Sequence, residues 1–275
     1  MPTYRRLKRS VLMALLAVTP ILFTMTGCGT LQDGKRWGQD AIYPVDIRRI
    51  AYAACHAIFD LQTLVPAAGA LVFTIDNYDK KASKWAITHH PIFGSENAAS
   101  QASDILVHAL GAETFVTALA TPSGKDSKDW TSAKAKGIGV EGGAELLTAG
   151  ATALLKDATD RTRPNGVGHS SFPSGHTSNA ASSSTLANRN LNFIPMPEEV
   201  RMPLQIGNIV LETGVGWARV EAGQHFPSDV LAGAALGHFL SAFIHDAFMG
   251  VPMNKMGIYV LPEKHGGMIG LSFGF

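Results

Sequence analysis

Two cations, a proline and the start of a small-residue segment are concentrated in one short part of the chain. Lys156 and Arg163 are seven residues apart, so on one continuous helix their side chains would point in nearly the same direction. Pro164 is expected to end that helix, because proline lacks a backbone N–H and restricts the residue before it. Ser174 is a predicted N-cap for the next helix, and Gly175 would let a backbone N–H approach a ligand closely. Positive charge facing a helix N-terminus is suited to bind an oxyanion, and a phosphate-like group is the expected ligand.

A second group of polar residues lies further along the chain, between Arg219 and Asp229. His225 is four residues before Asp229, so on one helical face the carboxylate would lie against one imidazole nitrogen. Such a pair fixes the tautomer and leaves the other nitrogen free to attack an electrophile. Pro227 is typical of the first turn of a helix, which would place His225 near a positive helix end. Arg219 adds a third cation, and three cations match the three non-bridging oxygens of a transferring phosphoryl group.

The sequence contains none of the patterns typical of a catalytic metal site or of a nucleotide-binding loop. It has no HExxH-type motif, no cluster of carboxylates and no Walker loop. We therefore expect a mechanism that uses neither a metal ion nor another cofactor. The charge of the phosphoryl group would be balanced by the three cations instead.

These residues together resemble the type-2 phosphatidic acid phosphatase and haloperoxidase superfamily, whose pattern is Lys-x6-Arg-Pro, then Pro-Ser-Gly-His, then Ser-Arg-x5-His-x3-Asp. Every ionisable position is matched. Ala218 stands where the family usually has serine, which removes a hydroxyl but no charge, so we expect altered activity rather than its loss. The loop from Pro164 to Pro173 is short for the family. In this chain the three parts read Lys156…Arg163-Pro164, Pro173-Ser174-Gly175-His176 and Ala218-Arg219…His225…Asp229.

The resemblance implies a role for each matched residue. His225 would be the nucleophile that forms a phosphohistidine, and Asp229 would orient it. His176 would protonate the leaving alkoxide and later activate the attacking water. Vanadate, which mimics phosphate, would bind in the same cluster as an inhibitor. The remaining matched groups would hold the phosphoryl oxygens: Lys156, Arg163, Ser174, the backbone N–H of Gly175, and Arg219.

The resemblance implies a phosphatase that hydrolyses phosphomonoesters or pyrophosphates, lipid phosphates included. Two other functions are left open. One is a vanadium-dependent haloperoxidase, because the same cluster binds vanadate, although those enzymes are usually much longer. The other is a non-catalytic envelope lipoprotein that binds phosphate. Soluble esters, phospholipids, polyprenyl pyrophosphates and lipid A are all candidate substrates.

The elements that position these groups are expected to be helices. Hydrophobic residues make up 46% of the chain and charged residues 16%, so a sizeable core is expected. Polar stretches at 77–97, 122–130 and 195–203 are predicted to be loops or connections. Apolar or small residues in helical patterns predict helices over residues 46–61, 103–120, 138–156, 177–187, 204–219 and 228–248.

The end of the chain is expected to differ from the rest. Met256–Leu261 and Met268–Phe275 alternate weakly and flank a turn-like stretch, which predicts a short β-hairpin. After the first 27 residues the longest apolar candidate, Val230–Ile244, is 15 residues long and contains His238. This is short for a membrane span and predicts a buried core helix. The predicted fold is therefore all-α: a single helical-bundle domain of the acid phosphatase and haloperoxidase type, with a short C-terminal hairpin.

The N-terminus has the order of a secretory signal. Basic residues precede an uncharged apolar run, Val11–Met25, and small residues follow before Cys28. Met25-Thr26-Gly27-Cys28 resembles a bacterial lipobox, in which the cysteine becomes the lipid-modified first residue. An ordinary cleaved signal and an uncleaved anchor are the alternatives. Because Gly29 follows the cysteine, the segment is similar to the outer-membrane sorting pattern of Gram-negative lipoproteins, and we expect a lipid anchor at the periplasmic side of the envelope.

The expected organisation is a lipoprotein signal peptide (1–27), a tether (28–43), a helical phosphatase domain (44–255) and a C-terminal hairpin appendage (256–275). Removing the signal peptide leaves 19 Lys and Arg against 22 Asp and Glu, a formal net charge of −3, so nucleic acid is not an expected partner. With Cys28 lipidated only Cys55 remains, and no internal disulfide is expected. The expected partners are a phosphorylated small molecule or lipid phosphate, and a membrane through the lipid anchor.

Overall fold

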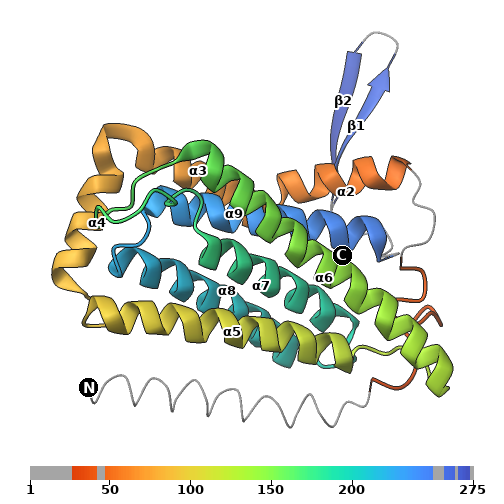
Figure 1. The fold of residues 1–275 in the computed structure, drawn as a ribbon. Helices are drawn as coiled ribbons and strands as arrows, with labels where there is room; N and C mark the ends of the chain where they lie inside the picture. The colour runs from red at the N-terminus through yellow and green to blue at the C-terminus, as the bar shows by residue number, and fades with distance from the viewer. Residues whose placement is uncertain (1–26, 42–46, 250–256, 264–265, 273–275) are drawn as a thin grey trace.

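The structure is a computed structural model that describes residues 27–41, 47–249, 257–263 and 266–272 (Figure 1). Almost all of the expected signal peptide lies outside these ranges. Within them most of the chain is helical, which confirms the all-α fold class. The helices are α2 (Ile47–Phe59), α3 (Leu61–Thr74), the 3₁₀ turn η1 (Ile75–Asn77), α4 (Tyr78–His89), α5 (Glu96–Ala120), α6 (Ser127–Thr159), α7 (Gly175–Phe193), α8 (Glu198–Glu221) and α9 (Pro227–Phe248).

Two strands follow the helices in the region where a hairpin was expected. Strand β1 (Gly257–Glu263) pairs antiparallel with β2 (Gly266–Ser272), and Tyr259 lies opposite Gly270 in the register. Figure 1 shows this ribbon projecting from the helices beside α2.

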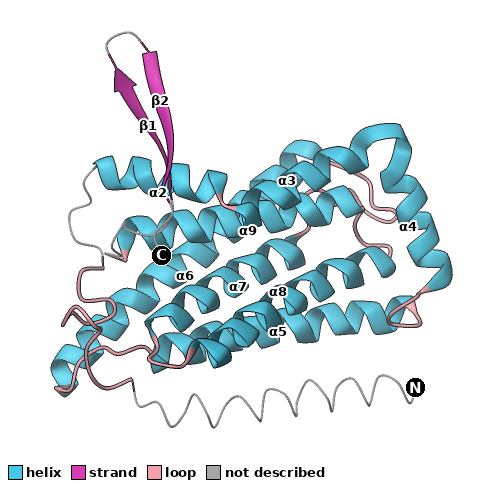
Figure 2. Cartoon of the chain, turned by 180° about the vertical axis from the view of Figure 1, so that it is seen from behind, coloured by secondary structure: helices cyan, strands magenta, loops and turns pink. Residues whose placement is uncertain are grey.

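Helix α7 occupies the centre of the bundle, with α5, α6, α8 and α9 packed around it (Figure 2). Most of its residues are buried, and they are mainly alanine, serine and threonine. Most of the buried hydroxyls have partners: Ser182 bonds Ser241 at 2.6 Å and Thr185 bonds Nδ1 of His238 at 2.7 Å. The hydroxyl of Ser184 has none among the described residues. Small side chains whose polar atoms are mostly hydrogen-bonded allow other helices to approach α7 on all sides.

The closest approach in the bundle is between α7 and α9, because glycine faces the contact. A Cβ atom at Gly237 would lie 2.1 Å from the carbonyl oxygen of Ser178. No side chain fits at that distance, so a residue larger than glycine would push α9 away from α7. On its other side α9 is covered by α2 and α3 (Figure 1).

Helix α9 lies inside the bundle, as expected for a core helix. By length and composition, Pro227–Phe248 is apolar enough to cross a membrane, and 56% of its most apolar window is buried inside the protein. The bent pair Ile47–Phe59 and Leu61–His89 passes the same test with a bend of 51°.

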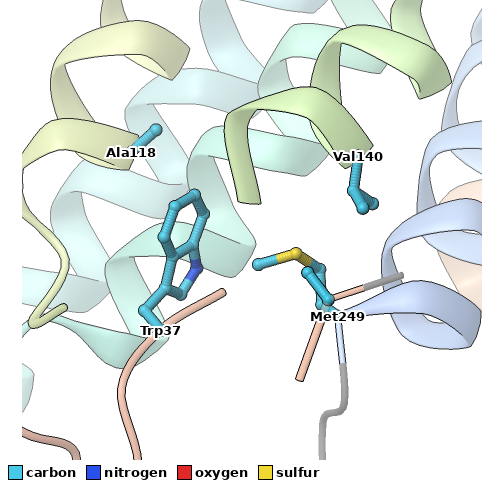
Figure 3. Close-up of a cluster of buried hydrophobic side chains, with 5 residues drawn as sticks. Trp37, Ala118, Val140 and Met249 are labelled. Carbon is cyan, nitrogen blue, oxygen red and sulfur yellow. The ribbon is translucent and has the colours of Figure 1, made fainter. Parts of the chain in front are cut away.

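The described part of the expected tether is not a free linker. Trp37 is 1% exposed and lies in a hydrophobic cluster with Ala118, Val140 and Met249 (Figure 3). Its backbone amide donates to the carbonyl of Pro122 at 2.8 Å. The prediction of a tether is therefore wrong for this segment. The residues around Trp37 are polar, but the indole alone buries enough apolar surface to hold the segment against the helices.

Three predicted connections also differ from the structure. The stretch 77–97, predicted to be a loop, contains α4, whose buried face carries Ser83 and Ala86. Helix α6 already begins at Ser127, inside the loop predicted over 122–130. Helix α8 begins at Glu198, inside the connection predicted over 195–203. Acidic residues in its first turn favour a helix start there, because they face the positive end of the helix dipole.

The packing of Trp37 can be tested on α6. A Cβ atom at Gly137 would lie 2.3 Å from Cζ3 of Trp37, so Gly137→Ala is expected to destabilise the fold by about 1–3 kcal/mol through overpacking. Gly139 has nothing within 4 Å of such an atom, so Gly139→Ala is the matched control. It is expected to stabilise the helix by about 0.5–1 kcal/mol. Urea unfolding followed by circular dichroism measures both changes. A Gly137→Ala variant as stable as Gly139→Ala would contradict the placement of Trp37.

Candidate functional site

The three motifs meet at one end of the bundle. Lys156 lies in the last turn of α6 and Ser174 is the N-cap of α7. Arg219 lies in the last turn of α8, and His225 precedes the first turn of α9. Residues separated by up to about 70 positions of sequence therefore converge, because four helix ends meet there.

The loop between α6 and α7, rather than a continuous helix, brings Lys156 and Arg163 together. Helix α6 ends at Thr159, where Asp160 adopts the left-handed conformation with φ 42°. The prediction that the helix reaches Pro164 is therefore wrong. Lys156 Nζ donates to the carbonyl oxygen of Ser170 at 2.5 Å, and Arg163 donates to the hydroxyl of the same residue at 3.1 Å.

The three predicted phosphate-binding cations form no ion pair with a carboxylate in the described part of the chain. Among the ion pairs of the described residues, none involves Lys156, Arg163 or Arg219. The Nε atoms of Arg163 and Arg219 are buried without a hydrogen-bond partner within the described chain. Burial lowers the pKa of Arg219 to about 10, so it stays protonated at neutral pH. Arg219 is buried, and Lys156 and Arg163 are half-buried. Cations that are taken out of water without an ion-pair partner are costly unless an anion binds, so these groups are suited to hold one.

Ser174 caps α7, as predicted. Its hydroxyl accepts from the backbone N–H of Thr177 at 3.4 Å and from the side-chain hydroxyl of that residue at 3.0 Å. The helix starts at Gly175, and the side chain of Lys156 lies 3.7 Å from where a Cβ of Gly175 would be. The N-terminus of α7 and a lysine thus lie side by side, which is the arrangement expected for an oxyanion site.

His225 is held in one tautomer by the backbone. It is 2% exposed, and its Nδ1 lies 2.6 Å from the carbonyl oxygen of Ser171. A carbonyl oxygen can only accept, so Nδ1 carries the proton and Nε2 keeps a free lone pair. The Nδ1 atom is 4.0 Å from Oδ2 of Asp229. The predicted contact between the carboxylate and the imidazole nitrogen is therefore bridged by Ser171, whose carbonyl accepts from His225 and whose hydroxyl donates to Asp229 at 2.5 Å.

The surroundings of His225 favour its neutral form. Burial lowers the pKa of His225 well below the usual value, and the positive charges of Arg219 and Lys156 lower it further. A neutral imidazole with a free Nε2 is the form that can attack an electrophile. Asp229 is buried, which raises its pKa, while hydrogen bonding from Ser171 and the charge of Arg161 act in the opposite direction.

Two residues that the sequence did not single out hold Asp229 in place. Arg161 donates to Oδ1 of Asp229 at 2.5 Å and, through its other nitrogen, to Asp79 at 2.8 Å. Asp79 also accepts the backbone N–H of Ser228 at 2.9 Å. Arg161 lies two positions before Arg163, which is a signal that could have been noticed. Asp79 was hidden because its helix, α4, was predicted to be a loop.

Helix α4 is tied to the site at its other end as well. Glu221 is fully buried and accepts the backbone N–H groups of Ile92 and Phe93, at 3.3 and 2.8 Å. It also accepts the indole N–H of Trp217 at 2.9 Å. Glu221 thus holds the turn between α4 and α5 against the end of α8.

His176 is the second residue of α7 and its side chain is 34% exposed. Its Nε2 lies 2.8 Å from Oδ1 of Asp104, which comes from α5. Burial and the charge of Arg219 lower the pKa of His176. His176 therefore lies at the same end of the bundle as the three cations. Its contact with Asp104 was not predicted from the sequence.

The comparison with protein-family models agrees with the motifs. Residues 142–250 match the model of the PAP2 superfamily. That range contains all three motifs, so the predicted resemblance is confirmed. No curated protein matches this chain. A transmembrane PAP2-type phosphatidylglycerolphosphate phosphatase from Bacillus subtilis is similar in structure, with a TM-score of 0.46 and 24% identity, over 70% of this chain and 94% of that one.

The electrostatics of the site predict an unusual titration of His225. Because burial and neighbouring cations lower its pKa, its ring is expected to stay uncharged at pH 6, below the ordinary pKa of about 6.5. Near pH 6 the His225 ring binds a proton in the unfolded chain but not in the folded chain. Lowering the pH from 7 towards 6 should therefore also reduce the free energy of unfolding. The titration of the histidine ring signals by NMR measures the pKa, with His225→Gln to assign the signal and the urea-unfolded protein as control. A His225 pKa at or above the ordinary value in the folded protein would show that the cations do not act on it.

Proposed function

We propose that this chain, whose residues 142–250 match the PAP2 superfamily, is a phosphatase that works through a phosphohistidine and needs no metal ion. The observation that supports the proposal most is a neutral, single-tautomer His225 beside three cations that form no ion pair with a described carboxylate. A phosphoryl group would supply the missing negative charge. The same group would present an electrophilic phosphorus to the free lone pair of His225.

In the first proposed step, Nε2 of His225 attacks phosphorus and forms a P–N bond. The bond from phosphorus to the leaving oxygen breaks, and its electron pair stays on that oxygen. His176 gives the oxygen a proton, so a neutral alcohol leaves. The positive charge that develops on the His225 ring is stabilised through the Nδ1–H bond to Ser171 and by Asp229 4.0 Å away.

In the second proposed step, water replaces histidine at phosphorus. His176, now neutral, takes a proton from the water while the water oxygen attacks phosphorus. The P–N bond breaks, its electron pair returns to Nε2 of His225, and inorganic phosphate is released. Throughout, Lys156, Arg163 and Arg219 would hold the non-bridging oxygens, joined by the backbone N–H of Gly175 at the start of α7 and by Ser174.

Exposed apolar residues near the site favour lipid phosphates among the candidate substrates. Helix α4 contacts the site through Asp79, and three exposed lysines follow on it, Lys80, Lys81 and Lys84. Aromatic residues and lysines at one surface are typical of proteins that lie at a membrane interface. The exposed hydrophobic residues in this region are Ile75, Tyr78, Trp85 and Ile92.

The lipid anchor remains part of the proposal. The side chain of Cys28 is exposed, so an acyl chain could be attached there without unfolding the neighbouring segment. Residues 44–255 would then form the phosphatase domain, to which the packed segment around Trp37 also belongs. We place the protein at the periplasmic side of the envelope, held at a membrane through Cys28.

Phosphate release by the full-length chain tests the proposed function. Suitable substrates are 4-nitrophenyl phosphate, a short-chain phosphatidic acid and a polyprenyl pyrophosphate, each with chelator and with or without vanadate. We expect release that resists the chelator and is inhibited by vanadate, and a faster reaction with the lipid substrates. Peroxide-dependent halide oxidation on adding vanadate, without phosphate release, would identify a haloperoxidase instead. Phosphate binding without either activity would identify a binding protein.

His225→Ala is the variant that tests the nucleophile. Without Nε2 no phosphohistidine forms, so we expect kcat to fall on the order of 10⁴-fold or more. Thermal unfolding should show a folded protein, because the change truncates a side chain at the edge of α9. His238→Ala is a useful control, since His238 bonds Thr185 far from the three cations and its loss should affect stability more than turnover. Wild-type turnover by the His225→Ala variant would rule out the proposed mechanism.

A further inference from the structure

We propose that Asp104 of α5 is a positioning residue that orients His176 and supports its protonated form during transfer to the leaving group. The inference rests on the proposed function, since it concerns the acid of that reaction. Asp104 lies outside the part of the chain that matches the PAP2 superfamily, residues 142–250, and belongs to none of the three motifs.

Helix α5 delivers two consecutive side chains to the site. The hydroxyl of Ser103 accepts from Arg219 at 3.2 Å, and Oδ1 of Asp104 lies 2.8 Å from Nε2 of His176. Ser103 is buried, whereas the Asp104 side chain is 54% exposed. Both contacts come from one turn of α5. The packing of α5 against α7 and α8 therefore sets the positions of His176 and Arg219 together.

The charges around His176 explain why a carboxylate is useful there. Arg219 of α8 and His108 of α5 both disfavour its protonated form, and Asp104 is the carboxylate that favours it. Lys156 of α6 lies against Gly175, the residue before His176. Asp229 of α9 is engaged by Arg161 and Ser171 instead. Without Asp104, His176 would be left facing mainly positive groups, and a group in such surroundings binds a proton poorly.

The contact also fixes which nitrogen can act. A carboxylate accepts, so the Nε2–H of His176 donates to Asp104, and Nδ1 is the nitrogen left to carry the transferable proton. As the bond from phosphorus to the leaving oxygen breaks, that oxygen keeps the electron pair and takes the Nδ1 proton. His176 becomes neutral and keeps its Nε2–H bond to Asp104. In the second step Nδ1 accepts a proton from the attacking water.

This role has a signature that a purely structural residue lacks. An alkoxide is a poor leaving group and needs the proton, whereas 4-nitrophenolate leaves readily without it. Asp104→Asn keeps the size of the side chain and removes its charge. We therefore expect Asp104→Asn to lower kcat/KM for glycerol phosphate or another alkyl phosphate by about 10-fold or more, a part of the roughly 10²–10⁴-fold that general acid catalysis contributes. The loss for 4-nitrophenyl phosphate should be under about 3-fold.

The experiment measures kcat/KM of the full-length chain against a series of alkyl, phenyl and nitrophenyl phosphates. This constant reports the step that forms the phosphoenzyme, independent of its later hydrolysis. Asp104→Glu keeps a carboxylate at an exposed position and should restore part of the activity towards alkyl phosphates. Glu96→Gln removes a charge from the first turn of the same helix and should leave the whole series unchanged.

Each outcome decides one question. A steeper dependence on the leaving group in Asp104→Asn, with Glu96→Gln unchanged, supports the positioning role. An equal loss for every substrate, or no loss, overturns it even when the wild type is active and His225→Ala is not. Inactivity of the wild type towards every ester would count against the proposed function itself, which is a separate result. Circular dichroism of Asp104→Asn identifies any loss that comes from misfolding.

Discussion

Three cations that form no ion pair with any described carboxylate are the constraint on which the rest of the site depends. Arg219 is 6% exposed and, like Lys156 and Arg163, has no carboxylate among its described contacts. Such charges are tolerated only where surrounding groups or a ligand compensate them. They also act on His225, whose pKa is lowered by burial and by these charges. The groups proposed to bind the substrate therefore also favour the neutral form of His225, the proposed nucleophile.

Closely packed helix ends hold the three cations and His225 in position. Helix α7 has small, hydrogen-bonded side chains, and glycine at position 237 lets α9 pack directly on its backbone. The backbone N–H of Ser174 donates to the carbonyl of Asp229 at 2.9 Å, which joins the starts of α7 and α9. Arg161 then links α9 to α4 through Asp229 and Asp79. The positions of His225 and of the N-terminus of α7 follow from these contacts between helix ends.

The sequence indicated which candidate residues come together at one end of the bundle, but not their contacts. Motif spacing identified His225, Asp229 and the three cations, because each is an unusual residue in an apolar, small-residue setting. It could not show that Ser171 stands between His225 and Asp229, since a loop conformation decides that. Nor could it reveal Asp104 or Asp79, which come from helices distant in the sequence and match no motif. Helix α4 and the burial of Trp37 were not predicted, because both segments are polar and have few apolar positions. Tertiary packing determines the structure of such segments.

Trapping the covalent intermediate tests the account most directly. The full-length chain would be mixed with a labelled phosphate ester, quenched in base within milliseconds, and digested for mass spectrometry. A phosphohistidine is expected, stable in base and labile in acid, on the peptide that contains His225, and absent from His225→Ala. A phosphoryl group on another residue, or turnover with no phosphoenzyme at any quench time, would contradict the claim that His225 is the nucleophile.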